Sequence, residues 1–342
     1  PLIGPVPGMK NYWVAVGVMA GFCQGGGVGK CIAEWIIDGE PSIDVWAMDV
    51  ARFGDYASPH YGTIKSSENY ERRFIMTFPN ETLPKGRKQK TTALYDRFVD
   101  QGAVMGDSFG LENVLWFANN KEDAHEEPTI KRSRSHDYVS KEVINVRENV
   151  GLIEVANFSK HEFKGSDARK FLDHIMAGKL PKPGRISLSP MLSYRGKLCG
   201  DLTVACHDEN EFIVFGSGAA QEMHRRWFES HLDKFNVNYK NRSDEYHGLS
   251  IAGPNSRKVL EKIVREDVTN EKFKFRDTRR MFVGSVPTIV NRISFTGELG
   301  YEIYVLPHYQ IKLYEELMEA GKEFNIKPFG SRALMSMRLE KN

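Results

Sequence analysis

Two carboxylates four residues apart stand in residues 294–304, Ser-Phe-Thr-Gly-Glu-Leu-Gly-Tyr-Glu-Ile-Tyr. Glu298 lies between two glycines, and Glu302 lies in the apolar run that follows them. The pattern predicts a hairpin of two extended runs joined through a turn at the glycines. A carboxylate held on such a hairpin can accept two parallel N–H donors from a planar ring. Both glutamates are candidates for that role, and Glu298 also suits the turn itself.

Asp201 is a third candidate carboxylate. Apolar residues alternate from Leu202 to Cys206 and again after Asn210, which predicts a second hairpin that Asp201 opens. Thr203 has its side chain on the same face of this strand as Asp201. An aspartate before a strand is commonly a turn-former, so its position alone leaves a role as general base open.

A glycine-rich segment follows the first predicted strand at residues 12–18. Gly25, Gly26 and Gly27 are predicted to form a turn that leads into a helix ending at Gly39. A strand, a glycine turn and a helix start leave backbone N–H groups unpaired, which favours a negatively charged ligand. The alternative is a tight turn in which the glycines serve packing alone. The G-x-G-x-x-G dinucleotide fingerprint does not occur in the sequence.

The composition predicts a protein that binds neither nucleic acid nor membranes. Lys and Arg total 47 against 45 Asp and Glu, and neither sign forms a long block. No apolar stretch reaches the roughly 18 residues that a membrane-spanning helix needs. Four cysteines without metal-binding spacing indicate free thiols in a reducing, intracellular compartment. His224 and His231 share a predicted helix, but without a carboxylate or thiol partner we expect no metal site.

Several motifs together carry a family resemblance that runs almost the whole chain. They lie at residues 17–29, 49–54, 78–81, 110–118, 294–304 and 330–341. The chain resembles the dimethylglycine/sarcosine dehydrogenase family, in which an FAD-dependent oxidoreductase domain is fused to an aminomethyltransferase (glycine-cleavage T-protein-like) folate domain. It looks like an internal fragment of such a protein.

The resemblance implies an α+β fold of antiparallel sheets with helices, divided into three parts. Residues 1–53 resemble the returning C-terminal segment of the FAD domain, and residues 54–117 resemble the connecting module. Residues 118–342 resemble the folate-binding domain, truncated before its last barrel lobe. If residues 1–53 are part of a larger domain, we expect Val14, Val16, Ile32 and Ile36 to be partly uncovered. Trp116 and Phe117 are expected to pack in the core or between domains rather than touch a ligand.

The resemblance also implies roles for individual residues. Asp201 resembles the general base of one-carbon transfer, and Glu302, rather than Glu298, resembles the carboxylate that binds the pteridine. Phe295 stands where relatives often carry Tyr, so a phenolic hydrogen bond is lost there. Arg332 resembles an arginine that contacts the ligand, and the alternative is that it forms a structural salt bridge near a helix start. The implied ligand contacts are Glu302, Thr203, Tyr304, Phe295 and Arg332 for tetrahydrofolate, and Gly25, Gly26, Gly27, Val28 and Gly29 for FAD.

The function implied is part of a flavin-dependent N-methyl amine dehydrogenase that passes the oxidised methyl carbon to tetrahydrofolate, giving 5,10-methylenetetrahydrofolate. Its partners would be a methylated amine and an electron-transfer acceptor protein, in the cytoplasm of a bacterium or the mitochondrial matrix of a eukaryote. This chain alone is expected to be inactive. Two alternatives remain: a free-standing aminomethyltransferase, and a non-catalytic protein resembling the regulatory subunit of pyruvate dehydrogenase phosphatase.

Overall fold

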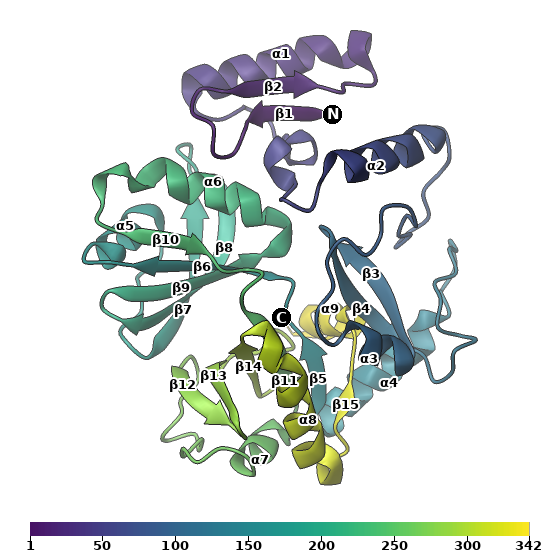
Figure 1. Cartoon of the computed structure of the whole chain (residues 1–342), viewed down its shortest axis with the longest axis vertical. Helices are drawn as coiled ribbons and strands as arrows, with labels where there is room; N and C mark the ends of the chain where they lie inside the picture. Colours follow the sequence, from purple (N-terminus) through teal and green to yellow (C-terminus); the bar gives the residue numbers. More distant parts are fainter. Residues whose placement is uncertain (342) are drawn as a thin grey trace. The chain divides into compact units, whose positions relative to one another are not determined.

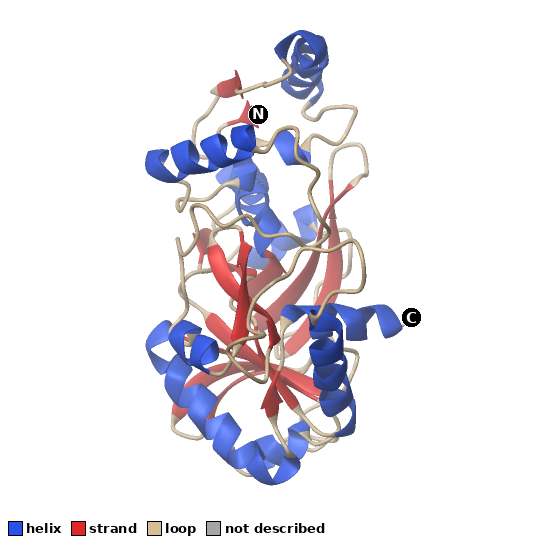
Figure 2. Ribbon diagram, turned by 90° about the vertical axis from the view of Figure 1, so that its right-hand side faces the viewer, coloured by secondary structure: helices blue, strands red, loops and turns tan. Residues whose placement is uncertain are grey.

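The computed structural model describes residues 1–341, and they form an α+β fold of antiparallel sheets with helices, as predicted (Figures 1 and 2). The chain divides into two compact units. The first consists of residues 1–57, 158–183 and 187–241, and the second of residues 58–157, 184–186 and 242–342. Residue 342, where the predicted folate domain ends, lies outside the described residues.

The first unit begins with a hairpin and a long helix. Strands β1 (Leu2–Pro5) and β2 (Trp13–Val16) pair antiparallel, and α1 (Gly21–Asp38) follows them. The helix ends at Gly39, whose φ of 83° is a conformation that favours glycine, as the sequence predicted. The predicted exposure of apolar residues is confirmed, because Val16 and Ile36 are 52% and 54% exposed and Val14 and Ile32 are half-buried.

The predicted turn at Gly25, Gly26 and Gly27 is wrong, because α1 begins four residues earlier, at Gly21. Each glycine weakens a helix by about 1 kcal/mol relative to alanine, which is why the sequence favoured a turn. Burial of Val28 in the helix and the edge-to-face contact of Trp35 with Trp13 oppose that loss. The amides of these glycines are therefore engaged inside the helix, and unpaired N–H groups occur only at its first residues.

A five-stranded sheet forms the rest of the first unit (Figure 1). Its core packs Phe163, Phe171, Leu202 and Phe228 between the sheet and two helices. The predicted hairpin is confirmed, since Val204 pairs with Val214. The strands, in spatial order, are β10 (Asn238–Asn241), β6 (Phe158–Lys164), β9 (Glu211–Ser217), β8 (Leu198–Asp208) and β7 (Arg185–Leu192), and the helices are α5 (Ala168–Ile175) and α6 (Gln221–His231).

A six-stranded sheet forms the centre of the second unit. Side chains of β14 alternate: Tyr301, Ile303 and Val305 enter the core that the helices cover, so Glu302 and Tyr304 face the other side. The strands, in spatial order, are β12 (Thr278–Val283), β13 (Val286–Asn291), β14 (Gly300–Val305), β11 (His247–Ala252), β5 (Gly151–Glu154) and β15 (Lys327–Pro328), and the helices on this core include α7 (Ser256–Glu261) and α8 (Gln310–Gly321).

A second hairpin and four further helices complete this unit. The packing predicted for Trp116 is confirmed: it is 1% exposed and stacks on Tyr138, with ring centroids 5.1 Å apart. Phe117 packs edge-on against Phe98 at 5.8 Å. These elements are β3 (Ala103–Ser108), β4 (Leu111–Phe117), α2 (Pro59–Glu71), α3 (Tyr95–Asp100), α4 (Ser135–Glu148) and α9 (Ser331–Glu340).

Short 3-10 helices occur in both units, at Trp46–Met48, Val50–Arg52, Gly218–Ala220, Leu232–Lys234, Pro307–Tyr309 and Lys322–Phe324.

Glu142 of α4 is hydrogen-bonded to two other segments of this unit. Its carboxylate accepts the backbone N–H of Phe117 at 2.7 Å and that of Gly330, just before α9, at 2.9 Å. Burial of the carboxyl group raises the pKa of Glu142 to about 7, although both N–H donors oppose that shift. At neutral pH this junction is therefore close to half protonated.

We expect the free energy of unfolding to fall as the pH rises from about 4.5 to about 7. The folded chain holds the Glu142 proton up to a pKa of about 7, whereas the unfolded chain releases it near 4.5. The stabilisation is fully present below pH 4.5, and its loss through this window amounts to about 3 kcal/mol. Urea denaturation at several pH values measures it. Glu142→Gln should flatten this part of the pH profile, and an unchanged slope would contradict the assignment.

Candidate functional site

Glu302 is a buried carboxylate at the centre of β14, opposite Ser250 of β11 and Asn291 of β13. It is 7% exposed, and its Oε2 accepts the phenolic O–H of Tyr304 at 2.8 Å. Burial, and then the neighbouring Glu302 charge, raise the pKa of Tyr304 well above its usual range, so the phenol remains a donor. The predicted proximity of Tyr304 to Glu302 is thus a direct hydrogen bond. The two oxygens of a carboxylate are chemically suited to a planar ring that presents two parallel N–H donors.

The segment before β14 is a loop rather than a strand. The second predicted run is confirmed as β14, which pairs with β13. The first run, predicted at Ser294 and Phe295, is wrong, because β13 ends at Asn291 and a loop connects the two strands. The Oγ of Ser294 donates to the carbonyl of Glu298 at 2.8 Å, and the Glu298 N–H donates to Thr296 Oγ1 at 3.2 Å. These local side-chain bonds replace the strand ladder.

The loop presents Glu298 and Phe295 in different surroundings from Glu302. Glu298 forms an ion pair with Lys341 at 3.1 Å, which favours its interpretation as a turn residue. Phe295 is 36% exposed, and the guanidinium of Arg338 lies over its ring at 4.8 Å. Arg338 was not predicted as a site residue, because nothing in the spacing shows that α9 brings it to this loop.

Arg332 at the start of α9 already has protein partners. Its Nη1 donates to Ser135 Oγ at 2.7 Å and lies 2.9 Å from Oε1 of Glu126. The same Glu126 oxygen accepts Trp116 Nε1 at 2.6 Å. This network favours the structural salt bridge for Arg332, and its role as a ligand contact stays a prediction.

Asp201 lies within β8 rather than before it, because the strand begins at Leu198. Pairing of β8 with β9 starts only at Thr203, so Asp201 stands beyond the end of that ladder. Leu202 and Val204 point into the core, whereas Asp201 is exposed and Thr203 half-buried. Within residues 1–341 the Asp201 carboxylate has no hydrogen-bond or ion-pair partner. Its lone pairs are available to accept a proton.

The candidate residues fall into groups that the two units hold separately. Asp201 and Thr203 share one face of β8 in the first unit. Glu302 and Tyr304 are bonded to each other in the second unit, with Phe295 in the adjoining loop. A pocket shared by Asp201 and Glu302 stays a prediction.

The glycine-rich segment of α1 is exposed, except at Val28. An added Cβ at any of its four central glycines would meet no atom within 4 Å. A flat group could approach the helix backbone closely there, so the segment fits the resemblance as a contact surface for FAD. It does not fit the predicted cradle of amides, which are engaged within the helix. The residues concerned are Gly25, Gly26, Gly27 and Gly29, with Val28 buried between them.

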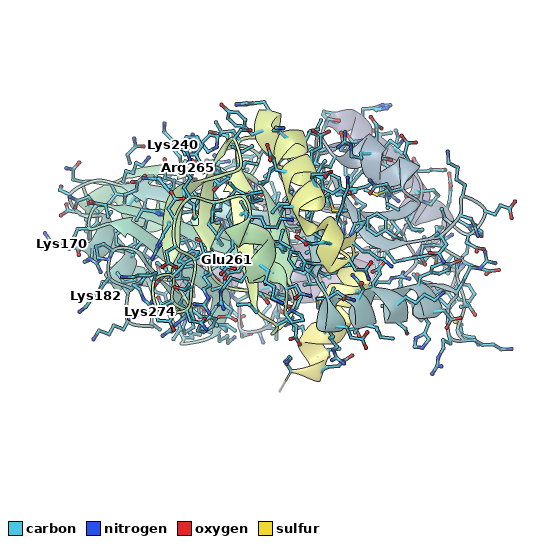
Figure 3. The ribbon with its side chains drawn as sticks, turned by 90° about the horizontal axis from the view of Figure 1, so that it is seen from below. Lys170, Lys182, Lys240, Glu261, Arg265 and Lys274 are labelled. Atoms are coloured by element: carbon cyan, nitrogen blue, oxygen red, sulfur yellow. The ribbon has the colours of Figure 1, made fainter. Side chains whose placement is uncertain are left out.

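Neither a metal cluster nor a membrane-spanning helix occurs in the described part of the chain. No three His, Cys, Asp or Glu side chains in it are placed to hold a metal ion. None of its helices is long and apolar enough to cross a bilayer. Exposed lysines such as Lys170 and Lys182 project outward (Figure 3), and Lys170 pairs with Asp167 at 3.1 Å.

Two family descriptions match this chain. Residues 94–342 match the GCVT N-terminal domain, and residues 38–92 match the FAD dependent oxidoreductase central domain. These matches meet near residue 93, whereas the sequence placed its boundaries after residues 53 and 117.

Curated relatives align with the whole chain. It is 36% identical to human dimethylglycine dehydrogenase (mitochondrial) over 345 residues, which cover 100% of this chain and 40% of that protein. It is 27% identical to human sarcosine dehydrogenase (mitochondrial) over 389 residues, covering 100% of this chain and 42% of that protein. The chain therefore spans about two fifths of the length of these relatives.

Among solved structures, the fold is similar to the crystal structure of glycine cleavage system aminomethyltransferase T from Bartonella henselae. The TM-score is 0.61 at 21% sequence identity, over 73% of this chain and 62% of that one. This similarity supports the predicted aminomethyltransferase-like fold.

Proposed function

Because the chain belongs to the GCVT N-terminal domain family and carries an FAD dependent oxidoreductase central domain, we propose that it is part of a flavin-dependent N-methyl amine dehydrogenase coupled to folate. The substrate is a methylated amine of the dimethylglycine or sarcosine type, and the product is 5,10-methylenetetrahydrofolate. The observation that carries the proposal is Glu302, a buried carboxylate with a hydrogen-bonded tyrosine in a fold like that of an aminomethyltransferase.

The two cofactors supply the chemistry that amino-acid side chains lack. When bound, FAD accepts a hydride from the N-methyl group, and tetrahydrofolate supplies the nitrogens that take up the methylene carbon. The open glycine segment of α1 from Gly25 to Gly29 would contact the flavin. Glu302 would accept the adjacent ring N–H and amino donors of the pteridine, with Tyr304 orienting the carboxylate.

Asp201 would handle the proton of the transfer. Formation of each new C–N bond at the folate leaves an N–H proton to be removed, and the departing amine leaves with its electron pair. The exposed, unpartnered carboxylate of Asp201 can accept that proton and also stabilise a nearby iminium cation. Thr203, on the same strand face, and Phe295, whose ring can stack but cannot donate, would complete the contacts; a contact of Arg332 would require its present ion pair to open.

Both alternatives are less well supported. A free-standing aminomethyltransferase has no need of residues 38–92, which match the oxidoreductase central domain. A regulatory, non-catalytic role has no need of an unpaired Asp201 together with a buried Glu302. The mitochondrial names of the human relatives support the matrix as the location if the source is eukaryotic, and the bacterial cytoplasm is the counterpart. An electron-transfer protein would reoxidise the flavin.

The test uses the whole protein that contains this chain, loaded with FAD. Dimethylglycine and sarcosine are added anaerobically while the flavin absorbance is followed, and products are measured with and without tetrahydrofolate. We expect amine-dependent bleaching, formaldehyde without folate, and methylenetetrahydrofolate with it. A protein that no methylated amine bleaches would instead support the regulatory alternative.

A further inference from the structure

Asp49 and Arg226 form a buried ion pair between distant segments of the first unit. Arg226 Nη1 and Nη2 donate to Oδ1 and Oδ2 of Asp49 at 2.9 and 2.7 Å, so the contact is bidentate. Asp49, the first residue of the motif at residues 49–54, is 2% exposed. Its Oδ1 also accepts the backbone N–H of Ala51 at 2.8 Å, at the start of the 3-10 helix Val50–Arg52. The carboxylate is therefore fixed in position by its own segment as well as by Arg226.

The guanidinium of Arg226 contacts two further elements near the beginning of the chain. Its Nη1 also donates to the carbonyl of Pro5 in β1 at 3.0 Å. The guanidinium carbon lies 5.2 Å from the ring centroid of Trp35 in α1. A planar guanidinium can make a bidentate contact and lie over an aromatic ring at once, whereas a lysine ammonium cannot. One side chain of α6 thus contacts β1, α1 and the 3-10 helix that follows them.

This ion pair joins the two regions of the chain that match different family descriptions. Asp49 lies within residues 38–92, which match the FAD dependent oxidoreductase central domain. Arg226 lies within residues 94–342, which match the GCVT N-terminal domain. Both residues belong to one compact unit. The pair is therefore a direct connection between the oxidoreductase part and the aminomethyltransferase-like part.

The helix that carries Arg226 packs on the sheet that carries Asp201. Phe228 of α6 lies in the same buried core as Leu202 and Val204 of β8. Asp201 directly precedes Leu202 on that strand. The position of α6 is therefore linked to the position of the Asp201 backbone.

A second set of contacts reaches the same strand but is exposed. In the turn before β8, Arg195 Nη2 lies 2.9 Å from Asp38 Oδ2 at the end of α1. Lys197 Nζ donates to the carbonyl of Ser42 at 3.1 Å. Exposed ion pairs of this kind contribute little, because solvent screens them and long side chains lose entropy. Of the two sets, the largely buried Arg226 is the one that can determine the arrangement.

We propose that Arg226 is a positioning residue that, through Asp49, fixes residues 1–53 relative to Asp201. A buried ion pair adds little net stability over apolar side chains of similar size, and its best-attested role is to select one arrangement. A misplacement of about 1 Å can slow a reaction by about 10²-fold, so capture of the oxidised carbon depends on this arrangement. The inference rests on the proposed function, because it takes oxidation at the flavin and capture at Asp201 as the two reactions.

The test uses the double variant Asp49→Asn/Arg226→Met of the whole enzyme. It leaves no unpaired buried charge, and asparagine can still accept the Ala51 N–H, so the variant should fold. We expect the ratio of methylenetetrahydrofolate to formaldehyde to fall about tenfold, with flavin reduction and folate affinity retained. Amide hydrogen exchange within residues 46–52 should become faster, which is a readout independent of turnover.

Arg225→Gln is the matched control on the same helix. Arg225 pairs with Glu222 at 3.3 Å and with Glu229 at 2.8 Å, and both partners belong to α6. Its product ratio and its amide exchange should equal those of the wild type. Arg226→Lys keeps the charge but loses the bidentate contact, so its ratio should lie between those of the wild type and the double variant.

The outcomes separate this proposal from the proposed function. A double variant that captures the carbon as fully as the wild type overturns the positioning role and leaves the function standing. A lower ratio with unchanged exchange in residues 46–52, or with an equal loss of flavin reduction, also overturns it. If the double variant does not fold, Arg226→Lys decides, and a wild-type ratio overturns the proposal. If the wild type itself forms no methylenetetrahydrofolate, the proposed function fails.

Discussion

Glu302→Gln is expected to weaken tetrahydrofolate binding by about 2–4 kcal/mol, a loss of roughly 30- to 1,000-fold in affinity. The carboxylate is buried in β14 and already accepts the Tyr304 hydroxyl. The substitution replaces one acceptor by an NH₂ group, which would face the donors of the pteridine edge. Because Glu302 would bind the ring in ground and transition states alike, the loss belongs to binding. Equilibrium titration of the whole enzyme with tetrahydrofolate measures it.

Two controls sharpen this expectation. Glu298→Gln alters the other carboxylate of the segment, whose partner is Lys341 in an exposed loop, and should change folate affinity by no more than about 0.5 kcal/mol. Flavin reduction by the amine should be the same in both variants. If the two variants bind folate equally well, Glu302 does not contact the pteridine.

Alternation of apolar residues was enough to predict the strands that carry the candidate site. Leu202, Val204 and Cys206 enter the core of the first unit, as their spacing indicated, and Tyr301 and Ile303 do the same in the second. In the structure, the same alternation leaves Glu302 on the face of β14 opposite that core. Period-two burial depends on local geometry alone, so one sequence reveals it.

The errors arose where tertiary contacts override local preference. Gly25, Gly26 and Gly27 predicted a turn, but burial of Val28 and packing of Trp35 maintain a helix there. Ser294 and Phe295 have strand-like surroundings in the sequence, but the bond from Ser294 to the Glu298 carbonyl forms a loop. Neither outcome follows from propensity, because each depends on contacts that the fold creates.

Residues that sequence reasoning missed are polar groups buried between distant segments. The Glu142 carboxylate accepts the backbone N–H groups of Phe117 and Gly330. The ring of His161, on β6, lies next to the ring of His224, on α6. A lone histidine or glutamate in a helix pattern looks like a surface residue. Its partners can be identified only once the strands and helices are placed.

Asp201→Asn is expected to leave oxidation of the amine intact while slowing transfer of the carbon to tetrahydrofolate. Asp201 would act on the proton released at the folate, after the amine has been oxidised, so flavin reduction and most of the folate affinity should remain. Loss of a general base slows a step by about 10²- to 10⁴-fold. Hydrolysis of the iminium then competes, and formaldehyde should replace methylenetetrahydrofolate as the main product. Product analysis in the presence of saturating tetrahydrofolate measures the partition.

Asp208→Asn provides the comparison on the same strand. Asp208 is the last residue of β8, and its Oδ1 accepts the Asn210 N–H at 3.2 Å within the turn. Asp208→Asn should therefore leave the ratio of methylenetetrahydrofolate to formaldehyde unchanged. If Asp201→Asn couples oxidation to folate as fully as the wild type does, another group removes the proton and the exposed carboxylate on β8 is not the base.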